Sequence, residues 1–273
     1  MRVALVISTY ERPDALAAVL DSVARLSLAP AEIVIADDGS GPATRELIAG
    51  FTQLSTVPVR VVSQPHAGFR LTRLRNLAID ATPADYLVFI DGDMLLHSEF
   101  IADHARVARR GFFTQGVRVR ADEALTRRLI AAPATPTHPW SPGLGGLRRA
   151  YLLRSAALAA GARRVANGLI AIKGCNQAFW RDDLVRANGF NEAIQGWGPE
   201  DKELCARLRN GGVHRQTLLF GGIAVHLHHP AASRASLPAN LAVLEATRRE
   251  RKVRCELGLD AHFRRRAEGA QNE

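Results

Sequence analysis

The chain has 273 residues, of which 47% are hydrophobic and 23% charged, and it carries a net charge of +9; this is the composition of a globular protein large enough to enclose an active site. The three cysteines show no C-x-x-C spacing, which argues against a disulfide framework and against a four-cysteine zinc site. No apolar run is long enough for a transmembrane helix or a signal peptide, so we expect a soluble cytoplasmic protein.

The first hundred residues alternate short apolar runs with segments of helical periodicity. Strands are predicted at 2–8, 32–36, 57–62 and 85–90, and helices at 13–26, 44–54 and 72–80. This order is typical of an α/β protein with a doubly wound, mostly parallel sheet. Ligands of such sheets bind beyond the carboxyl ends of the strands, which here carry the polar segments Thr9–Arg12, Asp37–Ser40 and Asp91–Asp93.

The segment 101–165 holds twelve arginines against three acidic residues and therefore carries as much net charge as the whole chain. It is either a basic patch facing an acidic ligand or a membrane surface, or a result of a general preference for arginine, since the chain has only three lysines. Aromatic residues make up only 6% of the chain, which argues against nucleic acid as the partner. The proline- and glycine-rich stretch 131–147 predicts a lid or a disordered loop, and 148–164 is a candidate helix.

The second half is less regular. Short helices are predicted at 182–188 and 200–209, each followed by glycine. An apolar run at 223–225 precedes histidines 226, 228 and 229, and residues 231–273 predict one or two basic helices.

Two carboxylates stand one residue apart in Asp91-Gly92-Asp93, at the end of a predicted strand. Both can reach one hard cation such as Mg²⁺ or Mn²⁺, although an acidic turn explains the same pattern. A neutral imidazole is a suitable further ligand. Strand alternation would place His226 and His228 on one face and turn His229 away.

The order of these motifs resembles family 2 glycosyltransferases of the GT-A (nucleotide-diphospho-sugar transferase) fold. The matching segments are VISTYERP at 6–13, EIVIADDGS at 32–40, RNLA at 75–78 and YLVFIDGDM at 86–94. A second block resembles the catalytic region of β-1,4-galactosyltransferases and the bacterial chondroitin polymerase: KGCNQAF at 173–179, GFNEAIQGWGPEDKE at 189–203 and HLHHP at 226–230. The segment 101–165 and the tail after 230 match none of these motifs.

The resemblance implies that Asp201 is the general base of an inverting sugar transfer and that Glu200 lies near the donor sugar. It also implies that Trp197 stacks on a sugar, with Gly198 and Asn176 beside it at the acceptor. From the residues alone, the two acids can equally be a helix N-terminus, where negative charge is favoured. The galactosyltransferases have another acidic residue after this pair, where the present chain has Lys202. The identity of the acceptor therefore cannot be transferred from those enzymes to this chain.

The same resemblance assigns the remaining site residues. The nucleotide would be lined by Thr9, Glu11, Arg12, Asp38, Arg75 and Asp91, and Mn²⁺ or Mg²⁺ would be held by Asp93 and by His226, which matches the family histidine. His228, which alternation places on the same face, is the further candidate ligand, and His229 is the alternative. The expected domain covers 1–230, with a nucleotide-binding half (1–100), a basic lid or acceptor segment (101–165) and a catalytic half (166–230). A basic helical extension (231–273) follows.

The sequence thus predicts a metal-dependent inverting glycosyltransferase. It would move a hexose or N-acetylhexosamine from a UDP-sugar to a bacterial surface glycan or lipid-linked acceptor, at the inner face of the cytoplasmic membrane. A sugar nucleotidyltransferase is the alternative of the same fold, but Ser8–Glu11 lacks the glycine- and lysine-rich loop of that class. A non-catalytic anion-binding protein would have no use for Glu200-Asp201 beside Trp197.

Overall fold

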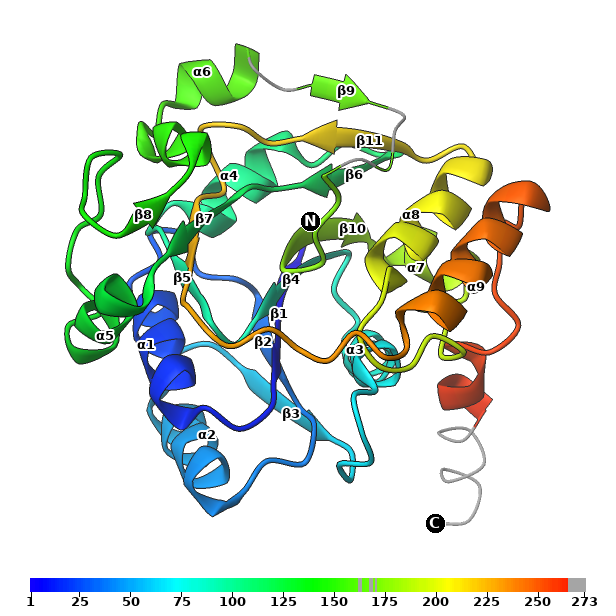
Figure 1. The fold of residues 1–273 in the computed structure, drawn as a ribbon, viewed down its shortest axis with the longest axis horizontal. Helices are drawn as coiled ribbons and strands as arrows, with labels where there is room; N and C mark the ends of the chain where they lie inside the picture. Colours follow the sequence, from blue (N-terminus) through cyan, green and yellow to red (C-terminus); the bar gives the residue numbers. More distant parts are fainter. Residues whose placement is uncertain (162–163, 167–168, 170, 265–273) are drawn as a thin grey trace.

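The computed structural model describes residues 1–161, 164–166, 169 and 171–264. Its centre is an eight-stranded sheet of order β3-β2-β1-β4-β10-β6-β11-β9, with a four-stranded sheet of order β5-β12-β7-β8 beside it (Figure 1). Within the described residues, no helix is long and apolar enough to cross a membrane.

The N-terminal half of the large sheet is parallel. Strand β1 (Val3–Thr9) lies between β2 (Glu32–Asp37) and β4 (Tyr86–Asp91), and β3 (Val59–Ser63) forms the edge. All seven residues of β1 are buried, because both faces of the sheet are covered, and such strands are continuous apolar runs. The register pairs Ser8 with Asp91 and Thr9 with Asp37, so the polar strand ends meet at one edge.

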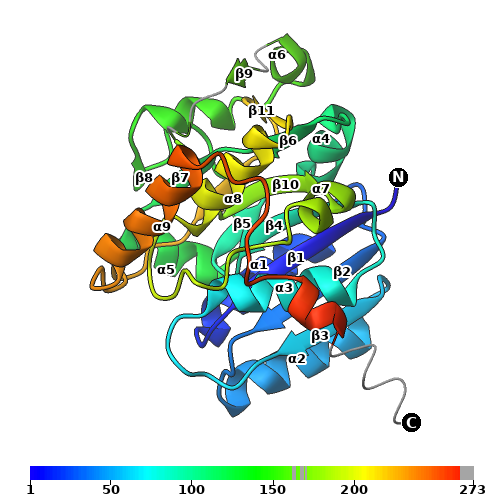
Figure 2. The same ribbon diagram turned by 90° about the vertical axis from the view of Figure 1, so that its right-hand side faces the viewer.

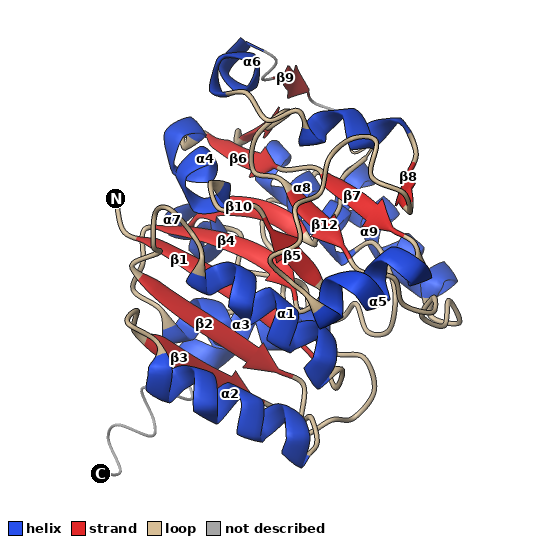
Figure 3. Ribbon diagram, turned by 90° about the vertical axis from the view of Figure 1, so that its left-hand side faces the viewer, coloured by secondary structure: helices blue, strands red, loops and turns tan. Residues whose placement is uncertain are grey.

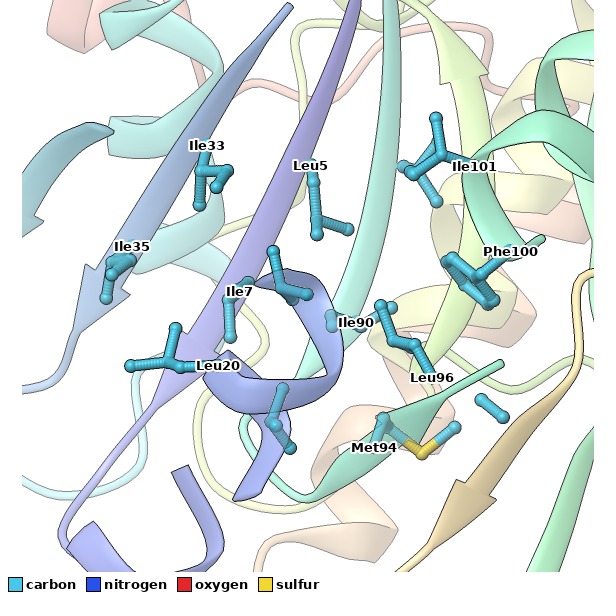
Figure 4. Packing of buried hydrophobic residues seen from close by; sticks show 14 of the residues in the cluster. Leu5, Ile7, Leu20, Ile33, Ile35, Ile90, Met94, Leu96, Phe100 and Ile101 are labelled. Atoms are coloured by element: carbon cyan, nitrogen blue, oxygen red, sulfur yellow. The ribbon is translucent and has the colours of Figure 1, made fainter. Parts of the chain in front are cut away.

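Helices cover both faces of this sheet. The first helices are α1 (Pro13–Ala24), α2 (Pro42–Leu54) and α3 (Leu71–Ala81). Leu5 and Ile7 of β1 pack with Leu20 of α1 on one face (Figure 4), whereas Ala4 and Val6 pack with α3 on the other. Figures 2 and 3 show α3 on one side of the strands and α1 and α2 on the opposite side.

The C-terminal half of the sheet is mixed. Strand β10 (Asn176–Trp180) runs antiparallel to both β4 and β6 (Phe112–Gln115); β11 (His214–Thr217) is parallel to β6, and β9 (Arg164–Ala166) closes the edge. In the small sheet, β12 (Ala224–His226) lies between β5 (Met94–Leu96) and β7 (Arg118–Ala121), and β8 (Leu144–Gly145) pairs with β7. This pairing brings His226 opposite Met94, directly after Asp93.

The other helices are α4 (Phe100–Val107), α5 (Glu123–Ala131), the 3₁₀ helix η1 (Leu147–Leu152), α6 (Ala156–Gly161), α7 (Arg181–Arg186), α8 (Glu200–Asn210) and α9 (Leu237–Arg249). Helix α9 packs against α8 (Figure 2). Beyond α9, Leu259 joins the core cluster of α3 and α8, and His262 contacts Glu192 at 2.5 Å. The C-terminal segment therefore returns to the domain.

The alternation predicted for the first hundred residues is confirmed, with element ends that differ by a few residues. The helix expected at 148–164 is wrong, because the described residues of this stretch form η1, α6 and the start of β9. The segment 101–165, expected as a basic lid or acceptor segment, contains α4, β6, β7 and α5, and its role stays a prediction. Strands of four residues such as Arg118–Ala121 are too short and too polar for periodicity to reveal.

Candidate active site

The ends of β1, β2 and β4 form the floor of the candidate site. The Asp38 amide donates a hydrogen bond to the Thr9 carbonyl oxygen at 2.9 Å, and the Gly92 amide donates to the Ser8 carbonyl oxygen at 2.7 Å. A Cβ at position 92 would lie 2.9 Å from Thr9 Oγ1, so only glycine allows this close approach. Thr9, Asp38 and the Asp91–Asp93 turn are therefore brought together, as expected for neighbouring parallel strands.

The side chain of Asp38 lies in a polar corner and is only 6% exposed. Its carboxylate accepts a hydrogen bond from Gln64 Nε2 at 2.5 Å and lies 3.2 Å from His66 Nδ1. The His66 ring stacks on Tyr10, with 4.1 Å between the ring centroids, and both rings reach the surface. Sequence motifs missed this aromatic pair, although the position of Tyr10 directly after β1 was a signal. Glu11 accepts a hydrogen bond from the Gly41 amide at 2.8 Å.

Arg75 connects the two halves of the site. It is 1% exposed; its Nη2 lies 3.0 Å from Asp91 Oδ1 and its Nη1 lies 3.5 Å from Glu200 Oε1. Nη2 also donates to the Gly174 carbonyl oxygen at 3.3 Å. The resemblance placed Arg75 beside the nucleotide. In the structure it contacts two carboxylates that lie 109 positions apart in the chain.

Asp93, His226 and His229 form the candidate metal centre. The Nε2 atoms of the two histidines lie 3.6 and 3.5 Å from the Asp93 carboxylate, and one ligand atom of each residue lies within 4.8 Å of the others. Asp93 Oδ1 is buried and accepts no hydrogen bond. A buried carboxylate oxygen normally has a partner, and a bound cation would provide one. Burial, together with Arg118, lowers the pKa of His226 to about 3, so its imidazole is neutral, as a ligand must be. These residues fit a divalent cation.

His228 does not join this group, contrary to the prediction from strand alternation. Strand β12 ends at His226, so the alternation does not continue, and the His228 side chain is exposed. The His228 backbone is anchored by Thr126 Oγ1 on one side and by Arg12 Nη2 on the other. His229, which was expected to point away, lies beside Asp93 instead. Arg12 also lies 3.5 Å from Asp93 and therefore stands at this centre.

Glu200 and Asp201 form the first turn of α8. Asp201 is 8% exposed, and its Oδ1 accepts a hydrogen bond from the Lys202 amide at 2.7 Å. Burial, with a contribution from the neighbouring Asp201 charge, raises the pKa of Glu200 to about 8, although Arg75 opposes this. Burial also raises the pKa of Asp201. Raised carboxyl pKa values in a cleft are typical of groups that exchange protons.

Trp197 is 38% exposed beside this turn, with the Arg234 guanidinium 5.1 Å from its ring centroid. Helix α9 holds its loop, because Asn240 Nδ2 donates to the Gln195 carbonyl oxygen at 2.8 Å and to that of Trp197 at 3.3 Å. A Cβ at Gly198 would lie 2.5 Å from Asn240 Nδ2. Gly198 therefore allows the helix to approach the loop.

Asn176 does not face the acceptor side as expected. It is 1% exposed, and its amide nitrogen donates to the carbonyl oxygens of Val117 and Gly222. Its amide oxygen lies 3.0 Å from His104 Nε2. With these groups engaged inside the fold, Asn176 ties β10 to the small sheet and leaves no group for a sugar.

Comparison with known families decides the classification. The profile described as "Glycosyl transferase family 2" matches residues 4–165, more than half of the chain. The chain belongs to glycosyltransferase family 2. A second profile, "N-terminal domain of galactosyltransferase", matches residues 160–230. The basic segment 101–165, which carries none of the quoted motifs, thus lies inside the family match.

Curated relatives are about 25% identical to this glycosyltransferase over the aligned residues. Chondroitin synthase of Escherichia coli is 25% identical over 240 residues, which cover 83% of this chain and 34% of that protein. Validoxylamine A glucosyltransferase of Streptomyces hygroscopicus subsp. limoneus is 26% identical over 225 residues, covering 77% and 48%. The chain spans half or less of the length of these relatives.

Solved structures confirm the predicted GT-A fold. Residues 1–349 of S. aureus TarS superpose with a TM-score of 0.63 at 12% identity, covering 96% of this chain and 68% of that one. The mannosyltransferase PcManGT from Pyrobaculum calidifontis, in complex with GDP-Man and Mn²⁺, superposes with a TM-score of 0.56 at 17% identity, covering 83% and 56%.

Proposed function

We propose that this protein is a metal-dependent, inverting glycosyltransferase that transfers a hexose or N-acetylhexosamine from a UDP-sugar to an acceptor hydroxyl. One observation carries the proposal: Arg75 links the strand-end Asp91, two residues before the metal candidate Asp93, to Glu200, beside the base candidate Asp201. Donor, cation and base would therefore meet around one buried side chain. The domain limits 1–230 and 231–273 belong to this proposal.

The donor would lie over the strand ends. The Tyr10–His66 stack offers a flat surface on which the nucleobase of the donor would lie. The Asp38 carboxylate next to it can accept hydrogen bonds from that nucleobase. A uridine donor is supported by the S. aureus TarS structures in complex with UDP and UDP-GlcNAc. The GDP-Man complex of PcManGT makes GDP-mannose the control donor.

Chemically, the acceptor hydroxyl would give its proton to Asp201 while its oxygen bonds to the anomeric carbon and the bond from that carbon to the diphosphate breaks. A divalent cation bound by Asp93, His226 and His229 would supply Lewis-acid stabilisation of the departing diphosphate. Arg75 keeps Glu200 in place beside the donor sugar. The exposed ring of Trp197 would stack on a sugar face.

The acceptor we propose is a bacterial surface glycan or a lipid-linked saccharide. This is supported by the chondroitin synthases and by the succinoglycan biosynthesis protein ExoM of Rhizobium meliloti, which is 27% identical over 106 residues. Peripheral contact with an anionic inner membrane face belongs to the same proposal. It is supported by the exposed side chains of Trp140 (72%) and of Leu147 (94%), which directly precedes the exposed Arg148 and Arg149 in the chain.

The test is release of UDP from a panel of UDP-hexoses and UDP-N-acetylhexosamines, with GDP-mannose as control, in the presence of Mn²⁺ and of EDTA. We expect turnover with one UDP-sugar that EDTA abolishes and Mn²⁺ or Mg²⁺ restores. A nucleotidyltransferase would instead release pyrophosphate from a nucleoside triphosphate and a sugar phosphate. An anion-binding protein would do neither. Full activity in EDTA would contradict the role of the metal.

A further inference from the structure

Two of the three lysines of this chain stand beside Asp201. Lys202 follows it in the first turn of α8. Lys173 precedes Gly174, whose backbone hydrogen-bonds to Asp201 and whose carbonyl oxygen accepts from Arg75. The backbone thus places both lysines at the base candidate, and Lys173 is exposed.

A third cation approaches from the small sheet. Arg118 Nη1 donates to Cys175 Sγ at 3.3 Å, two residues after Lys173. Burial and then the charges of Arg118 and Lys202 lower the pKa of Lys173, while Asp201 opposes this, so the three cations repel one another. The Arg118 charge also acts on both Asp93 and His226: it opposes the rise that burial and Asp91 cause in the pKa of Asp93, and it adds to the lowering of the His226 pKa by burial. Arg118 therefore lies toward the metal centre.

These cations have no carboxylate partner within ion-pair distance among the residues that the structure describes. Other basic side chains do: Arg106 and Arg154 bind Asp103, and Arg110 binds Asp182. Lys173 and Lys202 thus stand near the buried Asp201 carboxylate, and neither forms an ion pair with it. The donor diphosphate would neutralise Arg118 at the metal side, but it leaves the two lysines with no anion other than Asp201.

We propose that Lys173 and Lys202 form a subsite for an anionic group of the acceptor, a carboxylate or a phosphate close to the hydroxyl that reacts. The inference rests on the proposed function and names the acceptor class. An anion there would relieve the repulsion among the cations and would bind by charge-assisted hydrogen bonds. It would also explain why a lysine follows the Glu200-Asp201 pair.

The experiment compares three ligands that differ only at carbon 6: glucose, glucuronate and glucose 6-phosphate. Their binding to the full-length protein is measured by ligand-observed NMR, with Mg²⁺, with and without saturating UDP, at low and high salt. UDP occupies the donor site, so ligand that still binds occupies another site. The variants are Lys173→Gln and Lys202→Gln, and Lys252→Gln is the matched control, because Lys252 pairs with Glu250 in the C-terminal segment.

For the wild type with UDP we expect at least one acidic ligand to bind roughly tenfold more tightly than glucose, and less so at high salt. Lys173→Gln and Lys202→Gln should each lose about three- to tenfold of that affinity and leave glucose binding unchanged, whereas Lys252→Gln behaves as wild type. Glucuronate and glucose 6-phosphate distinguish a carboxylate from a phosphate.

Three results would overturn the proposed subsite. No acidic ligand binds better than glucose, UDP displaces the acidic ligands, or the lysine variants weaken the binding of glucose as much as that of the acidic ligands. The proposed function fails separately. If no UDP-sugar is turned over and UDP does not bind, the measurements without UDP still decide whether these lysines select an anion.

Discussion

Asp201 and Glu200 are neighbours in the chain, but their surroundings give them different tasks. Glu200 lies against Arg75, and burial with the nearby negative charge raises its pKa to about 8, which favours its protonated form near neutral pH. Asp201 accepts a hydrogen bond from the Lys202 backbone amide. This difference suits the proposed roles, in which Asp201 accepts the proton of the acceptor hydroxyl and Glu200 lies beside the donor sugar.

Replacing Asp201 by Asn should lower kcat by roughly 10²- to 10⁴-fold, because the amide keeps the size of the side chain but accepts no proton. Binding of UDP, measured by calorimetry, should change little. Since the base works deprotonated and burial raises its pKa, wild-type activity should fall as the pH falls through that pKa. A nearly active Asp201→Asn beside an inactive Glu200→Gln would show that the two roles are reversed.

The histidines allow a matched comparison at the metal centre. His229→Ala removes a group 3.5 Å from Asp93, whereas His228→Ala removes a side chain outside the cluster of Asp93, His226 and His229. We expect His229→Ala to raise the Mn²⁺ concentration for half-maximal activity by roughly tenfold or more, and His228→Ala to leave it within about twofold. Asp93→Ala should lose most nucleotide affinity. Equal metal dependence of the two histidine variants would contradict the assignment.

Helix α9 holds the Trp197 loop through Asn240. Asn240 is 3% exposed and faces the Gln195–Gly198 loop, while Leu241, the next residue of the helix, is 42% exposed. The C-terminal segment therefore helps to position the loop that carries Trp197, the residue proposed to contact the acceptor, although it carries no motif of its own.

Asn240→Ala should remove two hydrogen bonds and leave two carbonyl oxygens without this donor, at a cost of about 1–3 kcal/mol of stability. Because the loop carries Trp197, the acceptor KM should rise more than the donor KM. Urea unfolding and initial rates measure the two effects. Leu241→Ala is the control on the same helix and should change neither. Unchanged acceptor KM with lowered stability would limit Asn240 to a structural role.

For the molecule as a whole, buried polar contacts tie the C-terminal segment to the domain. Glu192 accepts hydrogen bonds from Asn76 of α3 at 2.8 Å and contacts His262 at 2.5 Å. Burial alone would raise the pKa of Glu192, but the bonds from His262 and Asn76 outweigh it and lower that pKa. Buried Arg207 also pairs with Glu203, which in turn accepts from Thr247 of α9.

A carboxyl group whose pKa is lowered in the folded state stabilises the protein above its unfolded pKa, about 4.3 for glutamate. This contribution is lost as the pH falls through the folded pKa. The free energy of unfolding should therefore decline below about pH 5, and Glu192→Gln should flatten part of that decline. Urea unfolding between pH 3 and pH 7 provides the measurement. An identical pH dependence of the variant would show that Glu192 does not contribute.

The sequence alone determined the parallel half of the sheet and the sites at its edge. Strands β1, β2 and β4 are buried on both faces and thus leave uninterrupted apolar runs, and the acids at 91, 93, 200 and 201 stand where such a strand ends or a helix begins. These signals are local, because a strand end and a helix start are visible within a few residues.

Only the tertiary structure decided which distant groups meet. His229 replaces His228 because the chain leaves β12 at His226 and turns, and no periodicity describes that turn. Arg75 forms ion pairs with Asp91 and Glu200, and the Asn176 side chain is buried inside the fold. Both follow from packing, which brings together groups from separate elements. Local patterns record which face of an element is buried, but the partner of each buried polar group is chosen by the packing of the whole chain.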